Sequence, residues 1–500
     1  MNQIQTHLTP ELAEWAKQIK AYALDCELDF FEVIFELLDY EELNMVAAYG
    51  GFPTRYPHWN FGMQFQELQK GYVYGLQKIY ELVINNDPCY AYLMRCNHLV
   101  DQQLVMAHVY GHADFFKNNY WFSKTNRKMM DEFANHGVRI RRYIERYGLK
   151  PVEDFLDCCL SLENLIDIHS PFIVRRRSGG EDAQDESPAD QVQAPRLKSK
   201  SYMDSYINPP SYLEAEKERI ISEIEGKRKF PESPEKDVLL FLIENAKFER
   251  WQRDILSMIR EEAYYFAPQA MTKIMNEGWA SYWHSTMMTE KICTAADIVD
   301  YADHHSKTMG MQPGKLNPYK VGLELFRDIE ERWDKGQFGP EWEECDDVVK
   351  KTSWDKKLGL GRKKIFEVRG IYNDVTFIDE FLTEDFAKRN NLFTYAFNKQ
   401  TRDYVIESRE FEQVKQKLLF GLTNAGQPSI AVDNGNYKNR GELYLRHEFQ
   451  GIPLDINSAK DTIGNLFKIW GRPVHLETVT DKRKKILSFS GSRHEEKVLR

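Results

Sequence analysis

The sequence lacks the cysteine patterns that stabilise secreted proteins or hold structural zinc. Its seven cysteines are an odd number, and no two of them form a Cys-x-x-Cys pair, which is typical of reduced thiols in a cytoplasm. The N-terminus has no basic start followed by an apolar region, and no uninterrupted apolar run of about 18 residues occurs. We therefore expect a cytoplasmic protein without a signal peptide or a membrane span.

The sequence also has no glycine-rich nucleotide-binding motif and no excess of basic charge. Neither a Rossmann nor a Walker spacing occurs, and the net charge is −10, so general nucleic-acid binding is not expected. The 500 residues are 42% apolar and 13% aromatic, which is enough to bury a large core in two or three domains. The composition therefore predicts a folded protein with no nucleic-acid partner.

Two histidines one helical turn apart are the first candidates for chemistry. If the surrounding segment is helical, His108 and His112 lie on one face, where two imidazoles can bind one divalent ion. Glu277 is the candidate third ligand, because zinc sites built on such a pair commonly take a carboxylate from a second helix. We predict that these three residues bind zinc or a similar divalent metal. Alternatively, the histidines are hydrogen-bonded core residues.

Other polar residues could carry out acid–base chemistry beside such a metal. His284 follows Glu277 by seven residues, so both side chains lie on the same face of a helix. His136 lies in an arginine-rich helical segment, and Asp114 follows the histidine pair. We predict these three residues, His284, His136 and Asp114, as catalytic candidates. Further candidates are Glu163, His304 and His305.

Changes of composition divide the chain into four parts. Residues 175–202 are polar and nearly free of large apolar groups, so we expect a disordered linker or surface excursion there. Residues 1–174 and 203–345 are expected to form two parts of one large, mainly helical domain. In residues 346–500, short apolar or β-branched runs alternate with helices, which indicates a small α/β domain with a mixed or antiparallel sheet. The predicted fold class is α+β.

Local patterns predict several element boundaries. Thr9-Pro-Glu-Leu is typical of a helix start, and we expect helices over residues 9–38 and again from Tyr90 through the histidine pair. Gly148 is expected to end a helix over residues 125–147. The segment Asp433-Asn-Gly435 is predicted to be a turn after a strand at 428–432.

The candidate ligands also resemble a known metallopeptidase pattern. His108-Val-Tyr-Gly-His112 resembles the His-Glu-x-x-His helix of the gluzincins, and Asn276-Glu-Gly-Trp-Ala280 resembles the helix that carries their third ligand. Across most of its length the chain resembles the stage V sporulation protein R (SpoVR) family. The residues that carry this second resemblance are Arg55–Trp59, Asn86–Leu93, Ala107–Asn119, Glu163–Asp167, Met275–His284, Asn317–Tyr319 and Arg327–Arg332.

The two resemblances imply a function. The gluzincin likeness implies a zincin-like helical domain and a metal-dependent hydrolase. The SpoVR likeness implies a role in forming the peptidoglycan cortex of the spore, with a peptidoglycan precursor or a protein as substrate. It also implies a regulatory assembly with a PrkA-type serine kinase, which is the family's usual genetic neighbour.

Val109 departs from the gluzincin pattern. The corresponding gluzincin residue is a glutamate that takes a proton from water and later returns it to the leaving group. Valine can do neither, and loss of a positioned general base typically costs about 10²–10⁴-fold in rate, so the ordinary peptidase machinery is excluded. Either another residue such as His284 transfers the proton, or the domain is a non-catalytic pseudo-metallopeptidase scaffold.

Overall fold

The chain folds into two compact units, and each unit is built from two separate stretches of sequence. The computed structural model describes residues 8–73, 81–173, 230–398, 400 and 402–499, with short pieces between 209 and 219. Unit 1 comprises Met1–Glu153 and Glu261–Gln427, and unit 2 comprises Asp154–Arg260 and Pro428–Arg500. The boundary predicted at residue 346 thus falls inside unit 1. The predicted linker at 175–202 lies outside the described residues.

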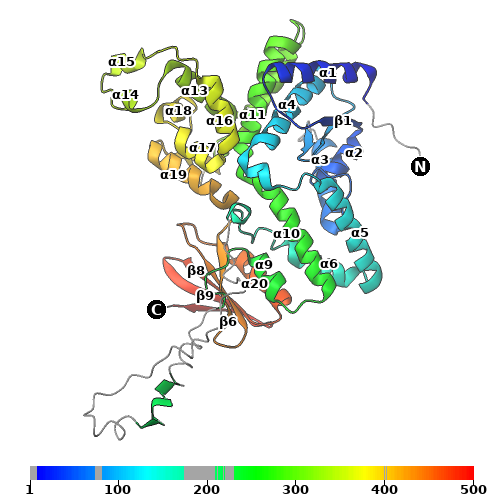
Figure 1. The fold of residues 1–500 in the computed structure, drawn as a ribbon, viewed down its shortest axis with the longest axis vertical. Coiled ribbons are helices and arrows are strands. Elements are labelled where there is room, and N and C mark those ends of the chain that lie inside the picture. Colours follow the sequence, from blue (N-terminus) through cyan, green and yellow to red (C-terminus); the bar gives the residue numbers. More distant parts are fainter. Residues whose placement is uncertain are drawn as a thin grey trace. The chain divides into compact units, whose positions relative to one another are not determined.

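Unit 1 is mainly helical, and unit 2 contains a small α/β body (Figure 1), as the predicted fold class requires. Within the part of the chain that the structure describes, no helix is both long and apolar enough to cross a bilayer. The sequence boundaries of the units at 153/154 and 260/261 fall within helices α6 (Leu149–Leu160) and α10 (Arg250–Met271). The other α-helices among the described residues of unit 1 are α1 Pro10–Asp25, α2 Tyr40–Ala48, α3 Trp59–Val73, α4 Leu99–Asn118, α5 Met129–Tyr147, α11 Lys273–Met287, α12 Ile298–Thr308, α13 Pro318–Lys335, α14 Pro340–Glu343, α15 Val348–Thr352, α16 Gly361–Ile371, α17 Asp374–Phe381, α18 Glu384–Arg389 and α19 Phe411–Leu422.

Unit 1 also contains a three-stranded sheet that the sequence did not predict. Strands β1 (Val33–Leu38), β2 (Leu82–Ile84) and β3 (Cys89–Met94) lie in the order β1-β3-β2, with β1 parallel and β2 antiparallel to β3. The helices expected over 9–38 and from Tyr90 are therefore partly wrong, because α1 ends at Asp25 and α4 begins at Leu99. Short apolar runs such as these are ambiguous between helix and buried strand. A second pair of strands, β4 (Thr394–Asn398) and β5 (Asp403–Ser408), forms an antiparallel hairpin.

Two helix ends follow the local sequence as predicted. The Thr9 hydroxyl accepts a hydrogen bond from the backbone N–H of Leu12, and Pro10 is the first residue of α1. Helix α5 ends at Tyr147, and Gly148 follows with a positive φ of 91°. These ends depend only on nearby residues, so the sequence is sufficient to place them.

Three helices pack closely at the centre of unit 1. A Cβ atom added to Gly278 on α11 would lie 2.4 Å from the backbone of Gly322 on α13. A Cβ added to Gly111 on α4 would lie 2.6 Å from Cα of Ala280 on α11. Both crossings therefore need glycine, because any larger side chain would overlap the facing backbone. Helix α11 is held between α4 and α13.

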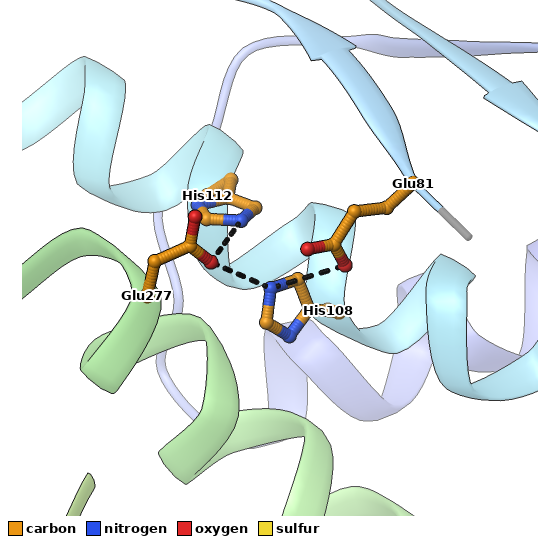
Figure 2. Close-up of side chains that lie close together, drawn as sticks. All are labelled: Glu81, His108, His112 and Glu277. Atoms are coloured by element: carbon orange, nitrogen blue, oxygen red, sulfur yellow. Dashed lines mark ion pairs between the residues drawn. The ribbon is translucent and has the colours of Figure 1, made fainter. Parts of the chain in front are cut away.

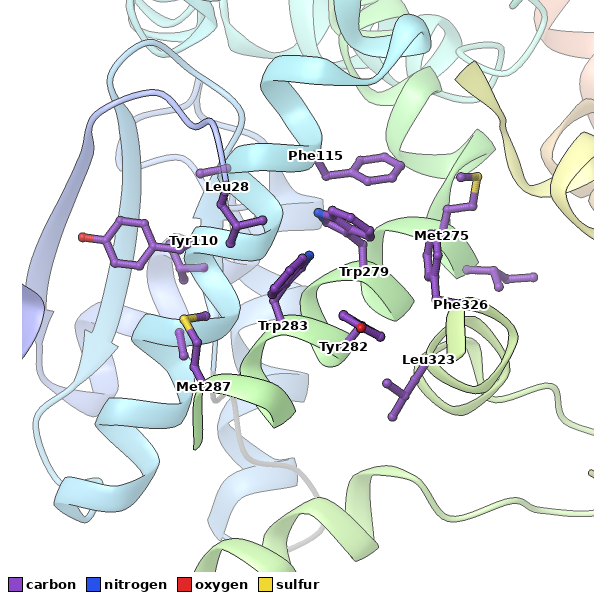
Figure 3. Close-up of a cluster of buried hydrophobic side chains, with 14 of the residues drawn as sticks. Leu28, Tyr110, Phe115, Met275, Trp279, Tyr282, Trp283, Met287, Leu323 and Phe326 are labelled. Carbon is purple, nitrogen blue, oxygen red and sulfur yellow. The ribbon is translucent and has the colours of Figure 1, made fainter. Parts of the chain in front are cut away.

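The hydrophobic core of unit 1 surrounds α11. Trp279 and Trp283 are almost completely buried, with ring centroids 5.5 Å apart in an edge-to-face arrangement, and Phe326 packs 5.2 Å from Trp279 (Figure 3). Glu277 and His284 on the same helix are also buried. Because water does not reach them, their polar groups need partners inside the protein.

Unit 2 contains a five-stranded mixed sheet in the order β10-β9-β8-β7-β6. Strands β7 and β8 are parallel, the other neighbours are antiparallel, and α20 (Ile456–Trp470) joins β7 to β8 and packs on β8 and β9. The turn predicted at 433–435 is wrong, because these residues lie within β6. Gly435 lies so close to Phe241 of α9 (Val238–Asn245) that an added Cβ would be 2.5 Å from its ring. The strands are β6 Ile430–Tyr437, β7 Glu442–His447, β8 Val474–Thr480, β9 Arg483–Phe489 and β10 His494–Val498.

Candidate metal centre

The predicted histidine pair lies in the middle of α4. His108 and His112 are both buried, and their ring centroids are 4.5 Å apart, as helical spacing of four residues requires. Val109 lies between them in sequence but packs in the hydrophobic core. The helix therefore presents two imidazoles on one face, and the position directly after His108 carries no carboxylate.

Two carboxylates approach His108 from different sides (Figure 2). Oε2 of Glu277, on α11, lies 3.4 Å from Nε2 of His108 and 3.4 Å from Nε2 of His112. Oε2 of Glu81, immediately before β2, lies 3.2 Å from Nε2 of His108. The ligating atoms of all four residues lie within 4.8 Å of one another. Sequence analysis predicted three of these residues and missed Glu81.

The four donor atoms fit a divalent metal ion. Atoms bound tetrahedrally to zinc at about 2.0–2.2 Å lie about 3.4 Å from each other, which matches the three distances above. Nε2 of His108 and Oε2 of Glu277 are buried and have no hydrogen-bond partner among the described residues, which is rare for buried polar atoms. Imidazole and carboxylate donors suit zinc, iron and manganese. The geometry thus supports a candidate metal centre without identifying the metal.

In each histidine, the ring nitrogen that faces away from the other donor atoms, Nδ1, is called the outer nitrogen here. Each outer nitrogen has a neutral partner. Nδ1 of His112 lies 2.8 Å from Oδ1 of Asn276, and Nδ1 of His108 lies 2.7 Å from Nδ1 of His284. A histidine that binds a metal through Nε2 carries its proton on Nδ1 and donates it to such a partner. Burial, together with neighbouring His108 and His305, holds the pKa of His284 well below its ordinary value. A neutral His284 can therefore accept this hydrogen bond.

The two carboxylates also have partners on their outer oxygens. Lys273 Nζ lies 2.5 Å from Oε1 of Glu277. Burial alone raises the pKa of Glu277, but His112, His108 and Lys273 together hold it well below its ordinary value, so this carboxylate is ionised, as a metal ligand must be. The Tyr319 hydroxyl donates a hydrogen bond of 3.1 Å to Oε1 of Glu81. Burial and the two carboxylates raise the pKa of Tyr319, so the phenol keeps its proton.

The four residues lie on the wall of a cavity of about 450 Å³. Apolar side chains from β2 and α4 form part of the lining, and histidines and lysines form another part. The predicted catalytic residue His284 lines this cavity, with its Nε2 3.4 Å from Nδ1 of His305. The remaining described lining residues are Leu82, Val83, Asp101, Leu104, Val105, Phe116, Gln269, Lys273, Asn276, His304, Lys307, Thr308 and Tyr319.

Asp114, the second predicted catalytic residue, has a different environment. Its carboxylate accepts hydrogen bonds of 2.8 Å from the Trp279 indole and from the backbone N–H of Asp29, and it pairs with Arg369 at 3.3 Å. Burial raises the pKa of Asp114 to about 6, although Arg369 opposes this shift. Asp114 is not among the described residues that line the cavity. These contacts join α4 to α11 and α16.

His136, the third predicted catalytic residue, belongs to a separate buried cluster of charges. Its Nδ1 lies 3.0 Å from Oε1 of Glu262, and its Nε2 lies 3.4 Å from Oε2 of Glu261. Arg55 pairs with the other oxygen of Glu262 at 2.7 Å. Like Asp114, His136 is outside the described lining of the cavity. The structure therefore brings only His284 of the three predicted residues to the candidate metal centre.

The fold and the site together define a mainly helical protein with a buried centre of two histidines and two glutamates beside a cavity. The sequence matches the family model described as "SpoVR like protein" over residues 6–427 and the model described as "SpoVR-like C-terminal domain" over residues 428–481. The chain therefore belongs to the SpoVR family. A relative from Escherichia coli (strain K12), "Uncharacterized protein YcgB", is 30% identical over 499 residues, which cover 93% of this chain and 90% of the relative. No solved structure matches the chain.

Proposed function

We propose that this protein is a metal-dependent hydrolase whose metal is bound by His108, His112 and Glu277. The observation that carries this proposal is the convergence of two buried donor atoms, Nε2 of His108 and Oε2 of Glu277, which have no hydrogen-bond partner among the described residues and lie beside a cavity. A divalent ion held there would act as a Lewis acid on a carbonyl or phosphoryl oxygen and would lower the pKa of a water molecule. Zinc is the first candidate, because a helical histidine pair with a carboxylate is a common zinc-binding arrangement.

Proton transfer in this hydrolase has to come from a group other than Val109. His284 lines the cavity, where it contacts the outer nitrogen of His108, Nδ1, rather than Nε2. This position suits a residue that orients His108 and passes a proton toward His305. Nε2 of His284 lies 3.4 Å from Nδ1 of His305. We therefore retain His284 as the proposed acid–base residue.

The proposed substrate is a peptidoglycan precursor or a protein, and the proposed process is formation of the spore cortex. Membership of the SpoVR family supports the process, and the metal centre supports hydrolysis. The same family membership is compatible with a scaffold that acts with a PrkA-type serine kinase, so the experiment has to separate catalysis from binding.

The first experiment measures metal content by inductively coupled plasma mass spectrometry on protein purified without a His tag. Wild type is expected to hold close to one divalent ion per chain, and a His108→Ala/His112→Ala variant is expected to hold none while keeping its circular dichroism spectrum. His494→Ala, which removes an exposed histidine in β10, serves as the matched control and should keep the metal. Absence of metal from wild type after incubation with zinc, manganese and iron would contradict the proposal.

The second experiment tests hydrolysis of soluble peptidoglycan precursors and of a peptide panel by the metal-loaded protein. Activity is expected in wild type and is expected to be lost in Glu277→Gln, with the fold retained. A protein that binds metal, hydrolyses none of these substrates and binds the kinase would instead support the scaffold function.

A further inference from the structure

Glu81 differs from the other three donors in the structural element that carries it. His108, His112 and Glu277 project from α4 and α11, which cross at Gly111 and Ala280 and are fixed by the core. Glu81 instead precedes β2, a strand of three residues at the edge of its sheet. Its side chain is 21% exposed, whereas those of the other three are 1–6% exposed. Glu81 is thus the least enclosed of the four donors.

The second polar atom of each donor side chain, the one that faces away from the other donors, also has a partner. These partners hold the three helical donors at shorter distances than Glu81. The partners of the three helical donors all come from α11: His284 at 2.7 Å from His108, Asn276 at 2.8 Å from His112 and Lys273 at 2.5 Å from Glu277. The outer oxygen of Glu81 has a longer hydrogen bond, 3.1 Å, from Tyr319 on α13. Partners of this kind fix the orientation of metal ligands. The helical donors are therefore held more firmly than Glu81.

The distances nevertheless place Glu81 within the ligand set. Its Oε2 is 3.2 Å from Nε2 of His108, close to the separation of about 3.4 Å between two atoms bound to one tetrahedral ion. Four protein donors would fill a tetrahedral ion completely, whereas catalytic zinc sites keep one position open for water or substrate. A hydrolase built on this centre therefore needs one donor that can leave.

We propose that Glu81 is an exchangeable fourth ligand, which occupies the metal in the resting protein and is replaced by an anionic oxygen of a ligand in the cavity. This inference rests on the proposed metal centre. Glu81 and Glu277 bring two negative charges to a divalent ion, while Lys273, which pairs with Glu277, adds one positive charge. A carboxylate or phosphate ligand that replaces Glu81 keeps a negative charge there, so the geometry points to substrates that carry such a group. Tyr319 holds the outer oxygen of Glu81 and acts as its positioning residue.

The experiment uses the full chain loaded with Co²⁺, whose visible absorption is intense in four-coordinate sites and weak in six-coordinate sites. Affinity is measured by competition with a chelator, and acetate is the probe for the anionic ligand. In Glu81→Ala we expect Co²⁺ to remain bound by the other three donors, with lowered affinity and with weaker absorption. Acetate is expected to restore the wild-type spectrum. Tyr319→Phe should lower the affinity by about 10-fold, and Glu412→Ala, at an exposed position on α19, should change neither quantity.

Two further variants give the test its controls. Glu81→Gln preserves size and should reproduce the loss of absorption if Glu81→Ala does not fold. Glu277→Ala should lose Co²⁺ beyond rescue by acetate, because Glu277 is a permanent ligand. Unchanged affinity and spectrum in both Glu81 variants would overturn the inference while leaving the proposed function intact. Complete loss of Co²⁺ from folded Glu81→Gln would also overturn it, because Glu81 would then be a permanent ligand. Failure of wild type to bind Co²⁺ would instead contradict the proposed function.

Discussion

Asn276 and Glu277 are neighbours in sequence but have different roles at the candidate metal centre. Glu277 directs its carboxylate to Nε2 of both histidines, while Asn276 accepts a hydrogen bond from the outer nitrogen of His112. Both residues are buried. One turn of α11 thus supplies a donor atom and a group that orients another donor.

Asn276→Ala tests this role at the residue scale. The variant removes the hydrogen-bond acceptor of His112, so the ring loses its fixed orientation, and we expect metal affinity to fall by about 10–100-fold. Competition with a chromogenic chelator measures this affinity. Asn457→Ala, on an exposed position of α20, is the matched control. An Asn276→Ala protein that binds metal as tightly as wild type would show that the hydrogen bond has no role in binding.

Local sequence patterns pointed to three residues of the candidate centre but not to Glu81, and each outcome has a physical reason. His108 and His112 have a helical spacing that places them on one face, and Glu277 has a recognisable local motif. Glu81 has neither, because it is a single carboxylate before a short strand and meets the histidines only in the folded protein. Asp114 follows His112 by two residues, and this separation on a helix turns its side chain toward Trp279 and away from the cavity.

At the scale of elements, the position of α11 depends on its close contact with α13. Gly278 and Gly322 face each other at this crossing, and a Cβ on Gly278 would lie within 2.4–2.8 Å of the backbone of α13. We expect Gly278→Ala to push the helices apart and to lower the free energy of unfolding by about 1–3 kcal/mol. It should also weaken metal binding, because Glu277 moves with α11.

Urea unfolding and chelator competition measure these two effects of Gly278→Ala. Gly464→Ala is the matched control, because Gly464 is a helical glycine of α20 with nothing within 4 Å of an added Cβ. There the alanine should leave stability unchanged or raise it by up to about 1 kcal/mol. Equal effects of the two substitutions would argue against a close α11–α13 contact.

The N-terminus of α11 is fixed by a buried carboxylate from another helix. Asp374, the first residue of α17, accepts backbone hydrogen bonds from Ile274 at 2.8 Å and Met275 at 2.9 Å. Burial raises its pKa from 3.8 to about 7, although these hydrogen bonds oppose the shift. Between these two values the folded protein keeps a proton that the unfolded chain has lost.

This difference gives stability a defined pH dependence. Because the folded state binds more protons, the contribution of Asp374 to the free energy of unfolding is present below about pH 4 and falls as pH rises toward 7. Asp374→Asn removes the titrating group. We therefore expect the stability of wild type relative to this variant to be greater at pH 5 than at pH 8, as measured by urea unfolding. A difference that is constant or grows with pH would contradict the buried, protonated carboxyl.

At the scale of the whole molecule, the two units are interleaved in sequence. All four donors of the candidate centre belong to unit 1, while α9 of unit 2 contacts β6, which belongs to the C-terminal stretch. The backbone of Glu235 also pairs with Val432 of β6. Removal of the C-terminal stretch should therefore affect the two units differently.

Truncation after Gln427 tests this organisation. We expect the shortened chain to bind metal within about threefold of the wild-type affinity, because unit 1 is complete. Loss of β6 should expose the apolar side chain of Phe241 on α9, whose ring contacts Gly435 and Trp470, and increase binding of a hydrophobic dye. Isothermal titration with metal and dye fluorescence measure the two effects. Loss of metal binding in a truncated protein that keeps its helical content would show that unit 1 needs the C-terminal stretch.

The sequence by itself determined the features that depend on residues close together in the chain. Helix ends such as Thr9 and Gly148, the helical histidine pair and the alternation of strands and helices near the C-terminus are set by local geometry and periodicity. Tertiary structure alone decided that residues 33–38 and 89–94 pair as strands, that residues 433–435 continue β6, and that Glu81 joins His108. Each of these depends on a partner distant in sequence, which the local pattern of residues does not identify.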